Sequence, residues 1–168
     1  MTVEVDDSGW GDLIGGAVIV LRRLRTNEKY SGEIPVEAFQ GKAFGEKAYL
    51  THALRIVREG VETLKIANDE PVHICTGYIL SEVRKALANE GYTVVPVKIV
   101  GVTQVYAETQ YVLHLARVAG IFPEEARHLR GFNMSLDWVL RDLHKRERLV
   151  KTGWKSWGRL RNDAKAKG

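Results

Sequence analysis

Apolar and polar residues alternate near the start of the chain, and this pattern predicts β-strands over residues 2–6, 17–23 and 33–39. The second of these segments is more apolar than the first. Short turns that contain glycine join the three segments, as is typical of neighbouring antiparallel strands. The first forty residues therefore predict a three-stranded antiparallel meander.

The hydrophobic period then changes from two to between three and four. Apolar residues recur at helical spacing over residues 50–64, 79–88 and 105–119. Two further strand-like runs, VHIC at 72–75 and TVVPVKIV at 93–100, lie between these helices. Because proline cannot donate to a strand ladder, Pro96 indicates an edge position or a bulge. The order β-β-β-α-β-α-β-α predicts an α/β protein with a mixed five-stranded sheet flanked by helices.

A shift in composition separates residues 1–122 from a basic extension over residues 123–168. From position 141 onward the chain carries ten basic and three acidic residues, whereas the whole chain has a net charge of +4. The first part of the extension repeats apolar residues at helical spacing, at Leu136, Val139, Leu140 and Leu143. This amphipathic helix is expected to dock on the body or on a second copy of the chain, which would make a homo-oligomer.

Composition narrows the class of protein further. Hydrophobic residues make up 45% of the chain and charged residues 27%, which is ordinary for a soluble domain. No apolar run approaches the roughly 20 residues of a membrane span, and no basic segment leads into an apolar one as in a secretory signal. The single cysteine, Cys75, excludes an internal disulfide framework and a thiolate zinc cluster. A cytoplasmic protein without a membrane partner is expected.

Acidic residues occupy positions where their charge needs a partner. Asp6 and Asp7 lie where the first alternation stops, and Glu46 and Glu108 lie four residues before apolar positions of the helices that follow them. The spacing places both glutamates on the apolar side of a first helical turn, where an unpaired charge is costly. A divalent cation such as Mg²⁺ or Mn²⁺ would satisfy several such carboxylates together. The alternatives are a turn carboxylate at the aspartates and acids favoured by the helix dipole at the glutamates.

Three segments resemble the ribonuclease H-like superfamily. The opening V-D-D-S-G-x-G-D-x-I-G-G-A-V resembles its first strand and turn, with Asp6 at the first metal-binding aspartate. The run GEKAYLTHALRIV resembles its first helix with Glu46 in place, and YAETQYVLHLARVAG offers Glu108 as the acid of its last helix. Size and opening motif look most like the archaeal single-strand-specific 3′–5′ exonucleases of this fold. The resemblance implies a metal-dependent nuclease with Asp6, Glu46 and Glu108 as metal ligands and catalytic residues.

The chain departs from that family at the end of its fourth predicted strand. Many members carry an aspartate there, but this chain reads ICTGY. Asp12 is a candidate to replace the missing acid. Asp7 is a candidate to replace Asp6 if the strand register slips by one, although alternation places Asp7 on the other side, where it would cap the turn. The sequence leaves open one metal, two metals, or a fold that has lost catalysis.

The basic extension combines cationic and aromatic side chains. Cations neutralise phosphates and aromatic faces stack on unpaired bases, so the extension is a candidate surface for single-stranded DNA or RNA. The candidate contacts are Lys151, Trp154, Lys155, Trp157, Arg159 and Arg161. The alternative is a solvated basic helix whose tryptophans pack against the body. The favoured hypothesis is a metal-dependent exonuclease on single-stranded DNA, and the other is a non-catalytic nucleic-acid-binding or scaffold protein.

Overall fold

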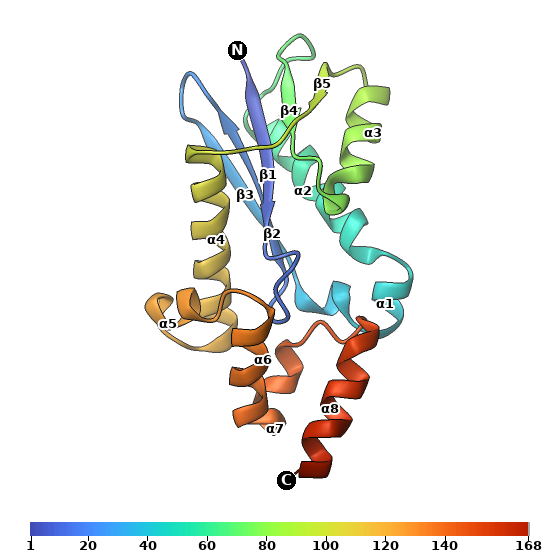
Figure 1. Ribbon diagram of the computed structural model, residues 1–168. Coiled ribbons are helices and arrows are strands. Elements are labelled where there is room, and N and C mark those ends of the chain that lie inside the picture. The colour runs from blue at the N-terminus through green and yellow to red at the C-terminus, as the bar shows by residue number, and fades with distance from the viewer. Residues whose placement is uncertain (168) are drawn as a thin grey trace.

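Five strands form one mixed sheet in the order β3-β2-β1-β4-β5, in a computed structural model that describes residues 1–167 (Figure 1). The strands are β1 Val3–Ser8, β2 Ala17–Arg23, β3 Lys29–Ile34, β4 Val72–Ile74 and β5 Val94–Pro96. The first three pair antiparallel, whereas β4 lies parallel to both β1 and β5. The predicted α/β class and mixed five-stranded sheet are confirmed.

Helices cover both faces of the sheet and extend beyond one of its ends. They are α1 Gly41–Gly45, α2 Ala48–Thr63, α3 Ser81–Asn89, α4 Val102–Ala119, α5 Pro123–His128, α6 Phe132–Arg141, α7 Leu143–Arg146 and α8 Lys155–Lys167. Short 3₁₀ turns are η1 Val36–Phe39, η2 Tyr78–Leu80 and η3 Glu147–Leu149. Figure 1 shows α4 on one side of the sheet and α2 and α3 on the other. Among residues 1–167, no helix has both the length and the apolar character needed to cross a bilayer.

Strand β2 supplies side chains to two separate cores. Ile19 and Leu21 pack in the core that contains α2 and α3, whereas Val18 and Val20 pack in the core that contains α4. All four side chains are fully buried. A central strand that is covered on both faces needs apolar residues at successive positions, which explains why β2 begins with an unbroken run of apolar residues.

The third strand lies earlier in the chain than the pattern over residues 33–39 predicts. It spans Lys29–Ile34 on the edge of the sheet, and most of its side chains are at least partly exposed. An edge strand open to solvent does not need the alternation of apolar and polar residues by which a half-buried strand is predicted. Pro35 ends the strand, and the apolar residues after it form the 3₁₀ turn η1. The prediction for Pro96 is confirmed, because β5 is the opposite edge and ends there.

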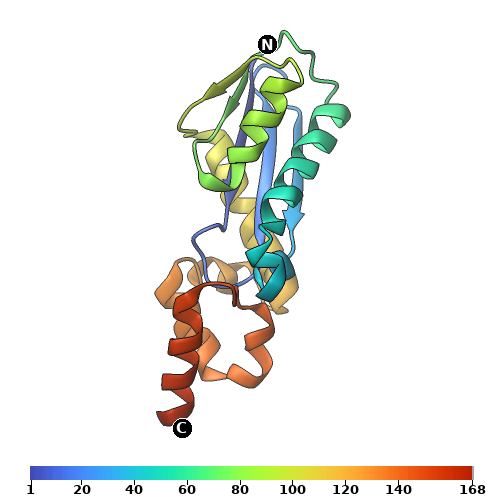
Figure 2. The same ribbon diagram turned by 90° about the vertical axis from the view of Figure 1, so that its right-hand side faces the viewer.

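The extension over residues 123–167 packs against one end of the sheet and forms the lower part of the molecule in Figure 2. Its buried side chains Val139, Leu149, Val150 and Trp157 belong to the same core as Leu115 of α4. The predicted amphipathic helix is α6, whose Val139 is fully buried within its own chain. That helix therefore provides no argument for a homo-oligomer.

Candidate active site

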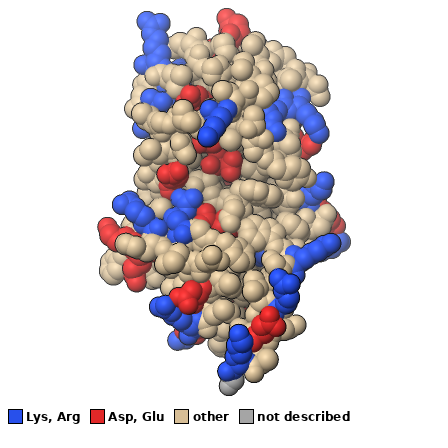
Figure 3. All heavy atoms as spheres, in the orientation of Figure 1, with Lys and Arg blue, Asp and Glu red and all other residues tan. Residues whose placement is uncertain are grey.

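An open cleft of about 390 Å³ lies at the carboxyl ends of β1 and β4. The last β1–β4 pair joins Val5 to Ile74, so Asp6 and Asp7 extend past the end of β4. Cys75 follows β4 directly, and atoms of Asp6, Asp7 and Cys75 that can bind a metal lie within 4.8 Å of one another. Figure 3 shows acidic side chains near the middle of this face with basic side chains around them. Asp7, predicted on the other side of the strand, thus belongs to the same cluster as Asp6.

The two aspartates concentrate negative charge where little water reaches them. Asp6 is only 5% exposed. Burial is the main cause that raises the pKa of Asp6, and the charges of Glu108 and Glu4 add to it. Burial and the neighbouring Asp6 raise the pKa of Asp7 to about 7. Such a pair favours either protonation or a bound cation.

The donor set fits a hard divalent cation through its oxygens. Mg²⁺ and Mn²⁺ prefer carboxylate ligands and keep some of their waters, which an open cleft allows. Burial and the two nearby aspartates raise the pKa of the Cys75 thiol, so that sulfur stays protonated and is a poor ligand for these ions. Asp6 and Asp7 are therefore the residues best placed to hold a metal.

Glu108 lies at the cleft, as the sequence predicts, although its side chain is exposed rather than turned toward the core. It lines the cleft together with Gln104, one turn earlier on α4, and the two side chains are hydrogen-bonded at 3.4 Å. Its charge is one of the causes that raise the pKa of Asp6. The structure therefore brings together Asp6, Asp7 and Glu108 from the set of predicted acids.

Glu46 does not reach the cleft, and the prediction that it faces the core is wrong. Helix α1 ends at Gly45, and Lys47 adopts a left-handed conformation with φ of 56° before α2 begins at Ala48. The apolar stripe of α2 therefore does not continue back to Glu46. The side chain of Glu46 is exposed and pairs with Lys42 at 3.3 Å.

Asp12 lies at the margin of the cleft but is already bound to the extension. Its Oδ1 accepts the N–H of Gly131 at 2.6 Å, and its Oδ2 accepts the Nε–H of Arg130 at 3.2 Å. The carboxylate is 5% exposed, so these bonds compensate its burial. Asp12 thus anchors the extension, and both of its carboxylate oxygens already accept hydrogen bonds there.

Side chains from α4 and from the extension fix the loop between β1 and β2. The hydroxyl of Tyr111 donates to the carbonyl of Ile14 at 2.8 Å, and the N–H of Gly16 donates to Nε2 of His114 at 3.3 Å. The ammonium of Lys151 donates to the carbonyls of Gly9 and Trp10. With the bonds of Asp12, these contacts hold the loop that starts immediately after the two aspartates.

The extension does not present the predicted row of nucleic-acid contacts. Lys151 is fully buried and Trp157 is 3% exposed, so neither lies on the surface. Trp154 stacks on Phe132 with ring centroids 6.2 Å apart, and Arg161 pairs with Glu147. Trp157 belongs to the core that contains α4, and Trp154 packs against that core, so both tryptophans face inward. Of the six predicted contacts, only Lys155 and Arg159 have exposed side chains.

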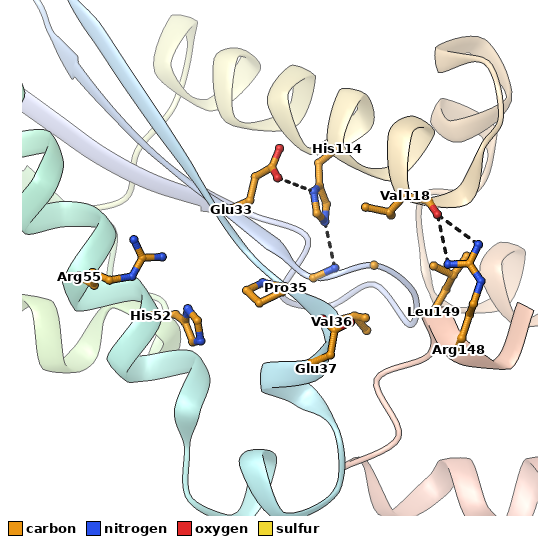
Figure 4. A pocket seen from close by; sticks show the side chains of 12 residues that line it. Glu33, Pro35, Val36, Glu37, His52, Arg55, His114, Val118, Arg148 and Leu149 are labelled. Atoms are coloured by element: carbon orange, nitrogen blue, oxygen red, sulfur yellow. Dashed lines mark hydrogen bonds and ion pairs between the residues drawn. The ribbon is translucent and has the colours of Figure 1, made fainter.

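A larger cavity of about 620 Å³ shares no lining residue with the cleft (Figure 4). His114 points into this region, with Nδ1 3.2 Å from Glu33 and Nε2 bound to the N–H of Gly16. Both ring nitrogens are thus occupied, and burial lowers the pKa of His114. His114 therefore ties α4 to β3 and to the loop between β1 and β2.

The sequence predicts neither the place of Arg130 in the cleft nor the burial of Lys151. Arg130 comes from the short connection between α5 and α6 and lines the cleft beside Asp12. No local pattern marks either residue, because each meets the loop only through a chain return of more than one hundred residues. Comparison of the sequence with models of protein families and with curated proteins finds no match.

Proposed function

We propose that the protein is a divalent-metal-dependent nuclease that hydrolyses phosphodiester bonds of single-stranded nucleic acid. The observation that carries this proposal is the group of Asp6, Asp7 and Glu108 at an open cleft beyond the ends of two parallel strands. The element order and the mixed sheet agree with the ribonuclease H-like fold that the opening segment resembles. The 3′–5′ direction and the preference for DNA rest on that resemblance alone.

The residues of the cleft divide into metal-binding and substrate-binding groups. Asp6 and Asp7, with Glu108 at the margin, would hold Mg²⁺ or Mn²⁺. When bound, such an ion activates water and stabilises the leaving oxygen of a phosphodiester displacement. Lys98 and Arg130 line the same cleft and supply positive charge toward a polyanionic substrate. The aspartates point into the cleft from a fixed strand, so little reorganisation is needed when the ion binds.

An aromatic surface beside the cleft favours unpaired bases. Trp10 lines the cleft, and its ring lies 6.0 Å from that of Tyr78, whose side chain is 46% exposed. The ammonium of Lys47 lies 5.9 Å from the ring of Tyr78. Aromatic faces with a nearby cation bind single strands, because the bases of a duplex are already stacked on one another. This surface takes the role that the sequence assigned to the tryptophans of the extension.

A non-catalytic nucleic-acid-binding protein is the second candidate. It is favoured because the cleft lacks two acids that the family resemblance implies. Glu46 lies elsewhere, and Cys75 rather than an aspartate follows β4. In that case the aspartates would still bind a cation, but substrate would remain intact.

The deciding experiment is digestion of a 5′-labelled oligonucleotide, single-stranded and duplex, as DNA and as RNA, with Mg²⁺, Mn²⁺ or EDTA. We expect metal-dependent products from the single strand, and a loss of at least about 100-fold in rate for Asp6→Asn, because the ion loses a charged ligand. Glu46→Gln is the matched control, since it removes an exposed carboxylate outside the cleft, and it should keep wild-type activity.

Intact substrate in every lane, with the single strand still retained in a gel-shift assay, would reject the nuclease and support the binding protein. If Asp6→Asn forms products at the wild-type rate, the active site does not lie at this cleft.

A further inference from the structure

Arg130 stands between the carboxylate cleft and a second cavity. That cavity, about 520 Å³ in volume, is lined by Val105, Val112 and Arg127, and it shares Glu108 and Arg130 with the cleft. The two hollows therefore adjoin along the side of α4, and Arg130 faces both. A chain of nucleotides that has one phosphate at the aspartates can continue into this second hollow.

The guanidinium of Arg130 is held in a fixed orientation. Its Nε donates to the buried carboxylate of Asp12 at 3.2 Å, and its Cζ lies 4.7 Å from the ring centroid of Tyr111. Tyr111 is itself fully buried, and its hydroxyl is bound to the carbonyl of Ile14. Both supports are rigid, so little side-chain entropy remains to be lost when an anion binds.

The remaining donors of this guanidinium are available to a ligand. Within residues 1–167 its Nε is the side-chain atom that forms a hydrogen bond, and the side chain is 30% exposed. A planar guanidinium whose Nε side is occupied presents its terminal N–H groups on the other side. Two such donors match two oxygens of a phosphate, which a lysine cannot reproduce.

We propose that Arg130 binds a backbone phosphate of the substrate next to the bond that is cleaved, and that the second cavity receives the adjoining nucleoside. The proposal rests on the proposed function, since it names how the same substrate is held. Apolar Val105 and Val112 suit the face of a base or sugar, and Arg127 adds positive charge to the lining. The basic extension thus contributes to substrate binding through Arg130, and not through its tryptophans.

Binding without hydrolysis tests this directly. The probe is a fluorescein-labelled single-stranded oligonucleotide, and its anisotropy is measured in EDTA over a range of NaCl concentrations. For Arg130→Gln we expect an affinity about tenfold weaker and a slope of log K against log salt reduced by about 0.7, the value for one lost phosphate contact on a single strand. Arg148→Gln is the matched control, because Arg148 is a basic residue of the same extension that lines the other cavity.

A purely structural role for Arg130 would lower thermal stability and leave the salt slope unchanged, and that result would overturn the proposal. If Arg130→Gln does not fold, Arg130→Lys decides, since it keeps a charge beside Asp12. If Arg130→Lys lowers the affinity about threefold or more and leaves the slope of log K against log salt unchanged, the proposal is supported, because lysine keeps the charge but loses the paired donors. Wild-type affinity rejects it. Failure of wild-type hydrolysis would reject the nuclease alone, because this binding assay does not depend on turnover.

Discussion

Among single residues, Lys151 supports the β1–β2 loop, which lines part of the cleft. Its ammonium is fully buried, donates to two carbonyls of the β1–β2 loop, and lies 4.6 Å from the ring centroid of Phe39. Carbonyl dipoles and an aromatic face both favour a cation, whereas burial opposes it. Burial dominates, and it lowers the pKa of Lys151 to about 7.

This pKa predicts a pH-dependent stability. The unfolded chain has an ordinary lysine pKa near 10.4, so between pH 7 and about 10 the unfolded state binds more protons and stability rises with pH. Relative to Lys151→Met, which cannot titrate, the free energy of unfolding of the wild type should increase by up to about 1.4 kcal/mol per pH unit in this range. Urea unfolding at pH 7, 8 and 9 measures the difference, and a constant difference would show that Lys151 has an ordinary pKa.

At the scale of elements, the loop between β1 and β2 is the part on which the site depends. Gly9 has a positive φ of 94°. A Cβ at this position would lie 2.3 Å from the ring of Tyr111, which is buried and cannot move aside. Glycine is therefore required both for the backbone conformation and for the close approach of α4. The guanidinium of Arg130 lies 4.7 Å from the centroid of the same ring, which links the loop to another residue that lines the cleft.

Replacement of Gly9 by alanine should destabilise the protein by about 2 kcal/mol or more, since strain in the backbone adds to a clash in the core. Gly11→Ala is the control, because a Cβ there meets no atom within 4 Å. Thermal unfolding of both variants gives the comparison. Equal melting temperatures for the two would mean that Tyr111 is not fixed against the loop.

At the scale of the whole molecule, the extension completes the body. The core on the α4 side of the sheet contains Val18 and Val20 of β2 together with Val139, Val150 and Trp157 of the extension. The bonds of Asp12 to Arg130 and Gly131 join the two parts at the cleft. The extension is thus packed both in the core and against the site.

A chain ending at Gly120 should lose cooperative unfolding, because the deletion exposes apolar side chains of this core and removes Lys151 and Arg130. A chain ending at Asn162 is the control, since it keeps Trp157. Thermal melts followed by circular dichroism test this expectation. If the chain that ends at Gly120 melted as cooperatively as the wild type, residues 1–120 would fold without the extension.

Elements whose pattern is local can be predicted from the sequence. Strands β1 and β2 and helices α2 and α4 follow from periodicity, because their buried positions recur at fixed spacing. Pro96 predicts an edge position or a bulge for β5, and the strand lies at the edge. Asp6 and Glu108, which the sequence predicts as metal ligands from the family resemblance and from their spacing, both line the cleft.

The remaining features depend on contacts between distant parts of the chain. The sequence pattern does not show that a left-handed residue separates Glu46 from α2, and the charge of Lys151 does not show that it is buried. The pairing of Arg130 with Asp12 joins residues 118 positions apart. Periodicity reports on neighbours two to four positions away, whereas such a contact exists only after the sheet has formed and the chain has returned to its end.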